Sequence, residues 1–271
     1  MKKPSSNCIL VLVFLTGLSL LLYPTVSDYW NSFHQSQAIS QYTEMVADID
    51  NHEYETLWSQ AEAYNSRLGT SLGRFTPDDA AHEDYMSQLN IGGTGVMGYL
   101  VIPSIDCELT IYHGTSDAVL QIAVGHIEGT SLPVGGESTH CVLSGHRGLP
   151  SAKLLTNLDK VVVGDLFLLQ TLGQTLTYEV DQIRIVEPQD ISALDMEAGK
   201  DYCTLVTCTP YGVNSHRLLV RGHRVENQEV KPEIRVTADA RQIDPTLVSA
   251  AVALPLLLVL VVGVLLTGKK H

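Results

Sequence analysis

Short aliphatic runs separated by turn residues constrain what the middle of this chain can fold into. Each run has the length of a strand and is bounded by Gly, Pro, Asn or Asp. The runs are residues 96–105, 108–112, 122–124, 140–144, 166–169, 176–186, 202–208 and 217–225. Leu172-Gly173-Gln174 indicates a hairpin turn, and short helices are expected near residues 116–121 and 152–158. About eight strands with few helices predict a β-barrel or a β-sandwich.

The residues before this β-rich part have a different pattern. Residues 28–89 are polar and helix-prone, with apolar side chains such as Tyr42 and Met45 recurring at helical spacing. This pattern predicts two or three amphipathic helices, which we interpret as a collar against the main domain or the membrane surface. Residues 76–81 are acidic and turn-forming and are predicted to be a loop.

Two uncharged apolar runs lie near the ends of the chain. Residues 8–23 follow Lys2 and Lys3 and are short for a spanning helix, so they indicate a signal-peptide core or a short signal anchor. Residues 246–267 precede Lys269 and Lys270 and are long enough to cross a bilayer. The lysines predict that both termini are cytoplasmic if the first run is uncleaved, with the chain between them outside the cell membrane.

These features predict five consecutive parts. They are a signal anchor or signal peptide, a helical segment, a β-barrel, a linker and a transmembrane helix. Their predicted bounds are residues 1–27, 28–90, 91–226, 227–245 and 246–268.

Charge and cysteine usage exclude some classes of function. The formal net charge of −13 argues against nucleic acid as a partner, because such binding relies on neutralising phosphates. The cysteines outside the first apolar run are sparse and show no disulfide-scaffold spacing. The chain has no CxxC or HExxH pattern, so we predict neither a metal site nor a cofactor.

Cys208 has the setting of a reactive thiol. It ends an apolar run, precedes the turn around Pro210 and Gly212, and is followed by a second run that begins near Arg217. A nearby cation favours the nucleophilic thiolate, and an arginine can hold a developing oxyanion. A lone cysteine is otherwise usually a small buried hydrophobe, which suffices for Cys107, Cys141 and Cys203.

His146 is the candidate partner of Cys208. It ends a strand and enters a glycine-rich turn, as Cys208 does before its own turn. If the two strands lie side by side and parallel, thiol and imidazole meet at the same edge. The same interval separates Cys141 from His146 and Cys203 from Cys208, so this register predicts that Cys141 and Cys203 are neighbours. Such a pair fits disulfide geometry poorly, and we expect two buried thiols.

These residues resemble a known family. Thr204-Leu205-Val206-Thr207-Cys208 matches the TLxTC motif of sortases, residues 144–148 resemble the sortase histidine loop, and Arg217 falls at the sortase arginine. Further segments are similar to the class C, pilin-polymerising sortases of Gram-positive bacteria. They are residues 98–105, 111–116, 129–136, 143–153 and 207–217.

The resemblance implies an eight-stranded sortase barrel and a cysteine transpeptidase. Cys208 would attack the Thr–Gly carbonyl of an LPxTG-like sorting signal and form a thioacyl enzyme. His146 would protonate the leaving amine, and Arg217 would bind substrate and oxyanion, with Thr207 and Ser144 as further contacts. The implied partners are LPxTG-containing surface or pilin proteins, with a pilin lysine or a cell-wall precursor amine as acceptor.

Class C sortases often carry an N-terminal lid with an Asp-Pro-aromatic motif. Residues 74–78 lie about where that lid is expected, but their sequence, Arg-Phe-Thr-Pro-Asp, lacks the tripeptide. The candidate lid residues are therefore Phe75 and Pro77, with Phe75 as the candidate substitute for the plug.

Three other functions remain open, the first within the family and the other two outside it. One is a housekeeping sortase that anchors proteins to the cell wall. Another is a Cys/His cell-wall peptidase, although such enzymes usually have a third polar group that orients the histidine. The third is a surface module without catalytic activity.

Overall fold

The computed structural model describes residues 6–69 and 73–227. The chain divides into two compact units, residues 1–30 with 234–271, and residues 31–233. The described part of the first unit is the beginning of helix α1 (Ser6–Asp48), where Leu12, Leu15 and Leu20 are exposed. From Val11 onward this helix is long and apolar enough to cross a membrane, and a signal sequence would look the same. The predicted transmembrane run 246–268 lies outside the described residues, as does the linker beyond residue 227.

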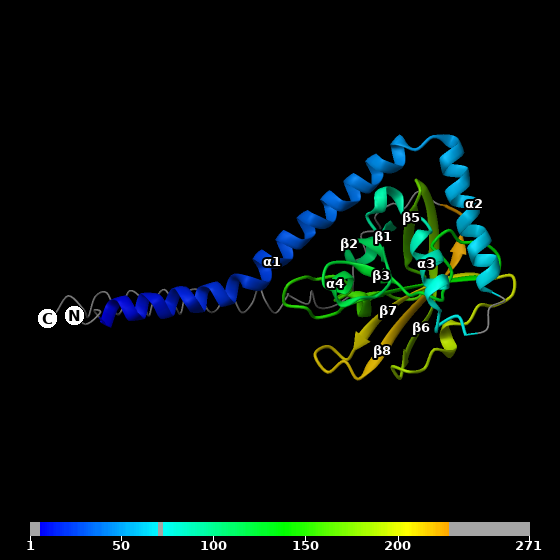
Figure 1. The fold of residues 1–271 in the computed structure, drawn as a ribbon. Helices are drawn as coiled ribbons and strands as arrows, with labels where there is room; N and C mark the ends of the chain where they lie inside the picture. The colour runs from blue at the N-terminus through cyan, green and yellow to red at the C-terminus, as the bar shows by residue number, and fades with distance from the viewer. Residues whose placement is uncertain (1–5, 70–72, 228–271) are drawn as a thin grey trace. The chain divides into compact units, whose positions relative to one another are not determined.

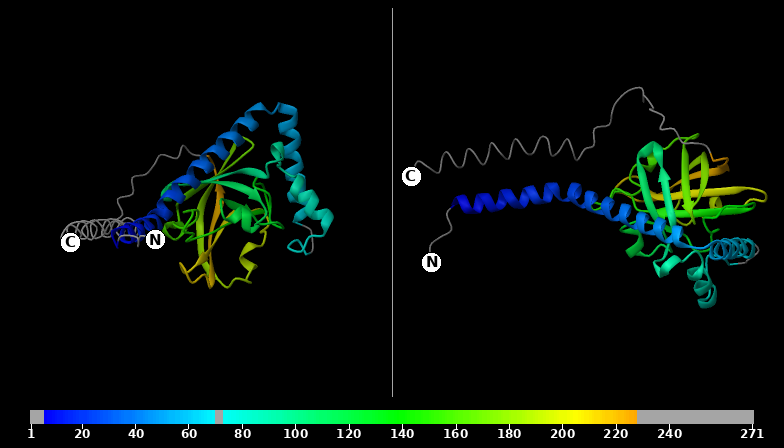
Figure 2. Two further views of the ribbon diagram at one scale, coloured as in Figure 1. Left: turned by 60° about the vertical axis from the view of Figure 1, so that its left-hand side comes forward. Right: turned by 90° about the horizontal axis from the view of Figure 1, so that it is seen from above.

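The described part of the second unit is built around a closed eight-stranded barrel with the order β1-β2-β3-β4-β7-β8-β6-β5 (Figures 1 and 2). This confirms the predicted barrel over the sandwich. The strands are β1 (Val96–Ile102), β2 (Cys107–His113), β3 (Val124–His126), β4 (Thr139–Gly145), β5 (Leu166–Thr171), β6 (Gln174–Val186), β7 (Asp201–Thr209) and β8 (His216–Val225).

The strand ends follow from local sequence. Pro103 ends β1 by starting a short 3-10 helix, since proline cannot donate to a strand ladder. The predicted turn between β5 and β6 has positive φ at Leu172 and Gly173, 49° and 75°. Positive φ at both central residues is the geometry that a two-residue hairpin requires.

Short helices join and flank the strands. An aspartate caps each of the two helices that follow α1: Asp50 accepts from the backbone N–H of Glu53, and Asp78 from that of Ala81. The helices and 3-10 turns are α2 (Asn51–Leu68), α3 (Asp79–Ser87), η1 (Ile91–Gly93), η2 (Pro103–Ile105), α4 (Asp117–Leu120), η3 (Leu158–Lys160) and η4 (Ser192–Leu194).

Two of the predictions for local structure were wrong. Residues 76–81 were expected to be a loop, but α3 begins at Asp79 because Asp78 supplies the cap. The helix expected at residues 152–158 is a series of turns that ends in η3. Leu154 has a φ of 37°, which a right-handed helix does not allow.

The helical segment shares its core with the barrel. Tyr42 on α1, Tyr64 on α2 and Tyr85 on α3 belong to the main apolar cluster. The Tyr42 hydroxyl donates to the Met97 carbonyl at 3.0 Å and accepts from the Leu172 N–H at 2.8 Å. These contacts fix the end of α1 on strand β1 and on the β5–β6 turn.

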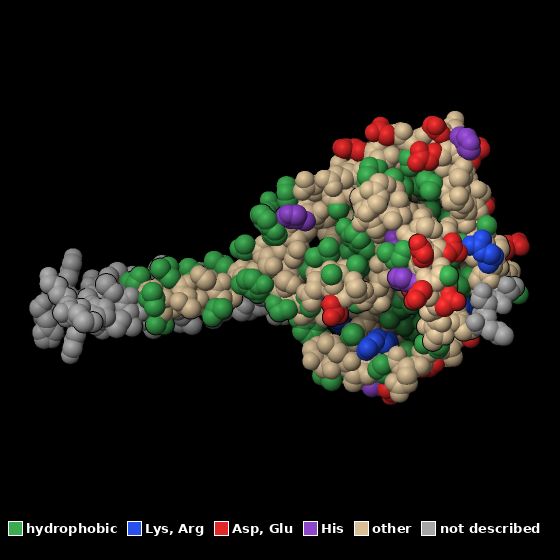
Figure 3. Space-filling model, viewed as in Figure 1, with side chains coloured by type: hydrophobic (Ala, Val, Ile, Leu, Met, Phe, Trp, Pro, Cys, Tyr) green, Lys and Arg blue, Asp and Glu red, His purple; other side chains and the backbone are tan. Residues whose placement is uncertain are grey.

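Acidic side chains gather over α2 and α3 on the face that Figure 3 shows. The exposed acidic residues of these two helices are Glu53, Glu55, Glu62, Asp79 and Glu83. Part of the negative charge of the chain is therefore carried by the helical segment.

Candidate active site

The parallel ladder between β4 and β7 determines which residues meet at one end of the barrel. Its register pairs Cys141 with Cys203 and ends with Ser144 opposite Val206. Because the two strands run in the same direction, equal steps beyond the last pair lead to His146 and Cys208. The Thr207 hydroxyl donates to the Gly145 carbonyl at 2.8 Å and continues the connection past the ladder.

Arg217 lies beside Cys208 on the other flank. Strands β7 and β8 are antiparallel, and their register places Cys208 directly opposite Arg217. The Arg217 guanidinium donates to the carbonyls of Asn214 and His216, at 3.3 and 3.1 Å. Cys208, His146 and Arg217 are all half-buried, so each remains accessible to solvent or substrate.

Alternation along these strands separates two faces. Cys203, Leu205 and the inner residues of β8 belong to the main core. The opposite face carries a smaller apolar cluster of Val142, Val186, Leu194, Val206 and Leu219. Because side chains alternate along a strand, Cys208 shares the face of Val206. The thiol therefore lies at the end of an apolar surface, on which an extended peptide could be held while its carbonyl reaches the sulfur.

Ser144 and Thr207, the two further residues predicted to contact the substrate, lie in different surroundings. Ser144 is half-buried on the same face as Val142. Thr207 is 1% exposed, and its hydroxyl is bound to the Gly145 carbonyl. This placement argues against the predicted substrate contact of Thr207 and favours a role in holding β7 against the end of β4.

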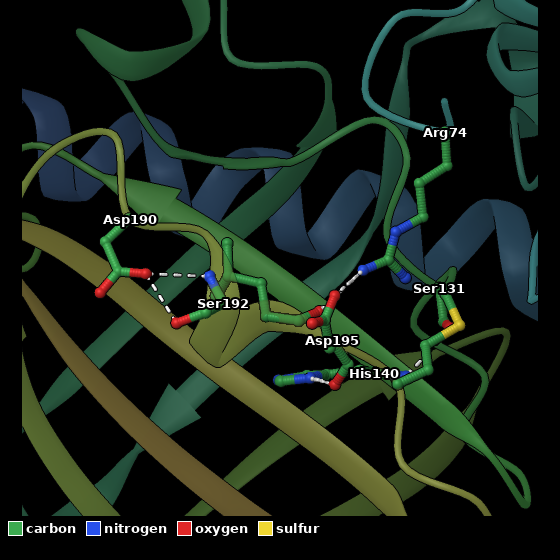
Figure 4. A network of polar contacts seen from close by, with 8 residues as sticks. Arg74, Ser131, His140, Asp190, Ser192 and Asp195 are labelled. Atoms are coloured by element: carbon green, nitrogen blue, oxygen red, sulfur yellow. Dashed lines mark hydrogen bonds and ion pairs between the residues drawn. The ribbon is translucent and has the colours of Figure 1, made fainter. Parts of the chain in front are cut away.

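The candidate lid residues contact two loops of the barrel. The Arg74 guanidinium donates to the Leu194 carbonyl at 3.3 Å and pairs with Asp195 at 2.9 Å, in the loop between β6 and β7 (Figure 4). It also lies 4.7 Å from the centre of the Phe75 ring. A Cβ atom at Gly129 would overlap the Arg74 carbonyl, so the segment lies directly on the β3–β4 loop as well. Pro77 is exposed.

His140 holds the β6–β7 loop in the same region. Its Nδ1 lies 2.8 Å from the Asp195 carbonyl (Figure 4). Its Nε2 lies 2.7 Å from the Thr204 hydroxyl. Because a carbonyl only accepts, Nδ1 carries the proton and Nε2 accepts from Thr204. Burial lowers the pKa of His140, and the positive charges of Arg221 and Arg74 lower it further. Both effects favour the neutral form of the imidazole.

The two register-paired cysteines are buried and free, as the sequence predicts. Burial raises the pKa of the Cys203 thiol well above its usual range. Cys107 is also free, and burial raises its pKa to about 12. Within residues 6–69 and 73–227, no group of three or more His, Cys, Asp or Glu side chains is placed to hold a metal ion.

Sequence reasoning did not find the ion pair of Arg74, nor the contacts of Arg147 next to His146. The Arg74 pair joins residues far apart in the chain, with no motif to mark them. Arg147 stands inside the histidine motif, but its partner Asp159 follows a turn that the sequence had predicted to be helical.

Comparison with known proteins agrees with this architecture. The family model for the sortase domain matches residues 100–225. Sortase C1 from Streptococcus agalactiae is 53% identical over 71% of this chain and 100% of that chain, with a TM-score of 0.69. Sortase C from Streptococcus pneumoniae is 46% identical over 70% of this chain and 97% of that chain, with a TM-score of 0.62.

A relative from another branch is sortase D of Bacillus subtilis (strain 168). It is 34% identical over 132 residues, which are 47% of this chain and 63% of that protein. The aligned part thus spans less than two thirds of this relative. The identity to sortase C1 over the whole of that chain shows that this chain belongs to the sortase family, and the sortase domain model matches its barrel. Its structural neighbours are class C sortases.

Proposed function

We propose that this chain is a class C-type cysteine transpeptidase. It cleaves an LPxTG-like sorting signal between Thr and Gly and transfers the new carboxyl end to an amine, a lysine of a pilin subunit. The observation that carries this proposal is the position of Cys208, opposite Arg217 across β7–β8 and level with His146 across the β4–β7 register. The similarity to class C sortases over about 70% of the chain supports the choice of acceptor.

In the first half of the reaction, the Cys208 thiolate attacks the threonine carbonyl carbon. The oxyanion that forms accepts hydrogen bonds from the Arg217 guanidinium, whose planar donors suit such a group. His146, as imidazolium, gives its proton to the glycine nitrogen as the C–N bond breaks. The products are a thioester on Cys208, a free glycine amine and a neutral imidazole.

In the second half, the acceptor amine attacks the thioester carbonyl. His146 takes the proton that the amine loses, and Cys208 leaves as thiolate, which restores the starting ion pair. With a lysine ε-amine as acceptor, the new bond is an isopeptide bond. The apolar face beside Ser144 and Val206 would hold the sorting signal during both steps.

A wall-anchoring sortase is the second candidate. It differs in the acceptor, which would be the amine of a cell-wall precursor, and it would use the same three side chains. Sortase A of Streptococcus agalactiae serotype III (strain NEM316) is 29% identical over 42% of this chain, so this branch of the family also resembles the barrel.

We place the reaction at the outer surface of the cell membrane. The apolar beginning of α1 would serve as an anchor or as a signal. Residues 246–268 would form a second anchor, and the lysines outside both runs would keep the termini in the cytoplasm.

The test uses the full-length protein in detergent micelles with a labelled LPxTG peptide. Without an added amine, intact-mass analysis should show the peptide up to Thr attached to Cys208. With a lysine-bearing pilin peptide, a ligated product should replace it, whereas a peptidase would release only the acid. Cys208→Ala should be inactive, and Cys107→Ala is the matched control, because Cys107 is also half-buried and free. Activity in Cys208→Ala would refute the proposal.

A further inference from the structure

The residues that follow β4 are held by backbone contacts to the next turn. The His146 carbonyl accepts from the Leu155 N–H at 3.2 Å. The Gly148 N–H donates to the Thr156 hydroxyl at 3.0 Å. These two bonds fix the main chain on either side of Arg147, so the direction of the Arg147 side chain is determined by the fold.

Arg147 is a buried charge with a single carboxylate partner in the described part of the chain. Its guanidinium lies 2.5 Å from the Asp159 carboxylate, and its side chain is 8% exposed. Its Nε–H is buried without a hydrogen-bond partner among the described residues. A buried ion pair with an unsatisfied donor is a poor source of stability. Violations of this kind concentrate at functional sites.

Tyr211 lies against the same segment from the other loop. A Cβ atom at Gly148 would be only 2.8 Å from Cε2 of the Tyr211 ring, so the ring is flush with the Gly148 backbone. The Arg147 guanidinium carbon lies 5.8 Å from the centre of that ring, within range of a cation–π contact. Gly148 also has a φ of 76°, which favours glycine here for a second reason. Tyr211 as a whole is 61% exposed.

The contact with Tyr211 joins the loop that follows His146 to the loop that follows Cys208. Tyr211 belongs to the loop that joins Cys208 to Arg217. The β4–β7 ladder ends at Ser144 and Val206, before it reaches His146 and Cys208. One step beyond the Ser144–Val206 pair, the Thr207 hydroxyl donates to the Gly145 carbonyl and so connects β7 to the end of β4. The contact of Arg147 and Gly148 with Tyr211 connects the loop after β4 to the loop after β7.

We propose that Arg147 is a positioning residue for the transpeptidation reaction. Anchored by Asp159, it holds the histidine loop against Tyr211 and thereby sets the distance between the His146 imidazole and the Cys208 thiol. This inference rests on the proposed function, because it assumes that these two groups exchange a proton. Its contribution is indirect, because it acts through the loop that carries His146.

The effect should fall on turnover and not on binding. A misplacement of about 1 Å can cost about 100-fold in rate. Arg147→Met keeps much of the side-chain volume but removes both the charge and the planar donors. We expect it to lower kcat by about 10- to 100-fold while KM for the LPxTG peptide changes by less than about twofold. Arg147→Lys should recover part of kcat, because the pair with Asp159 can re-form without its planar geometry.

Tyr211 variants separate positioning from folding. Tyr211→Ala leaves the Arg147–Asp159 pair intact and should lower kcat in the same way, whereas Tyr211→Phe should retain the parent kcat, because the ring alone makes the contact. The double variant Arg147→Met/Tyr211→Ala should be no slower than the slower single variant. Arg67→Met is the control, because Arg67 forms an ion pair with Asp84 at 2.9 Å within the helical segment.

The full-length protein in micelles is assayed for kcat, KM and melting temperature with every variant. Parent activity that depends on Cys208 establishes the proposed function independently. Against that background, unchanged kcat in Arg147→Met and Tyr211→Ala would refute the positioning role alone. The role is also refuted if Arg147→Met loses activity only as its melting temperature collapses while Tyr211→Ala behaves like the parent. Fully additive losses in the double variant would likewise contradict a shared contact.

Discussion

Cys141 on β4 lies directly opposite Cys203 on β7, and both are free thiols in the barrel interior. This pairing defines the register of the parallel ladder. Because His146 follows Cys141 at the same interval as Cys208 follows Cys203, the register brings His146 and Cys208 level with each other. A shift of this ladder by one residue would move one of those residues to the opposite face. The register therefore determines whether thiol and imidazole can meet.

The same arrangement predicts how the four cysteines of the barrel react relative to one another. Among these four, we expect iodoacetamide to label Cys208 first in the native protein, because it is half-buried and lies beside Arg217. Cys107 should react slowly, since burial raises its pKa to about 12. Cys141 and Cys203 should react only after unfolding. Peptide mass spectrometry under non-reducing conditions measures this order, and a linked Cys141–Cys203 peptide would contradict it.

Arg217 should not tolerate replacement by lysine. Loss of one oxyanion donor typically costs about 100- to 1000-fold in rate, and a lysine ammonium cannot reproduce two planar donors. We therefore expect Arg217→Lys to lower kcat/KM by about that factor. Arg184→Lys is the matched control, because Arg184 is an exposed arginine on β6, the strand that pairs with β8. Full activity in Arg217→Lys would remove the oxyanion role from this residue.

The sequence was sufficient for the barrel because its strands are short, aliphatic and separated by Gly, Pro and Asp. It also marked Cys208, His146 and Arg217 as candidate site residues, since each stands where a strand meets a turn. The strand registers bring the three together, and their catalytic roles stay predictions. The equal spacing from Cys141 and Cys203 predicted the neighbouring positions of the two cysteines, which the ladder confirms.

The remaining features depend on tertiary contacts that leave no local pattern. The pair of Arg74 with Asp195 joins segments that are far apart in the sequence. The contact of Tyr211 with Gly148 depends on how two loops fold back at one end of the barrel. Thr207 was expected to face the substrate, but strand alternation turns its side chain inward. The motif therefore identified Thr207, but only the strand geometry shows to which side its side chain points.

Acidification should destabilise the fold through its buried histidines. Burial lowers the pKa of both His140 and His113 below their usual value of 6.5. As the pH falls below about 6.5, the unfolded chain binds protons that the folded chain does not, so the free energy of unfolding decreases until the lowered folded pKa is reached. His140→Gln retains hydrogen-bonding groups without titrating.

Melting temperatures between pH 5 and 8 measure this effect. The free energy of unfolding obtained from these melts should change less with pH in His140→Gln than in the parent. The two slopes should differ by at most about 1.4 kcal/mol per pH unit for one proton. His52→Gln is the control, because His52 is exposed on α2. Equal slopes in the parent and in His140→Gln would show that His140 does not contribute.

Arg74 should control how firmly the candidate lid residues lie on the barrel. Its side chain is 14% exposed, but its partner Asp195 is 71% exposed, so the ion pair contributes only about 0–1 kcal/mol. Removing the ion pair should change the equilibrium constant between the attached and detached states of residues 73–78 by no more than about fivefold. Arg74→Met should therefore be cleaved faster by proteases within this segment, and the rate with an LPxTG peptide should rise by up to the same factor.

Arg67→Met again serves as the control. It removes the ion pair of Arg67 with Asp84, which lies within the helical segment, and leaves the pair of Arg74 with Asp195 in place. If Phe75 acts as the plug, Phe75→Ala should raise the peptide rate as much as Arg74→Met does, because the two side chains contact each other. Faster cleavage without any gain in rate would mean that the segment is anchored to the barrel but does not obstruct the path of the sorting signal to Cys208.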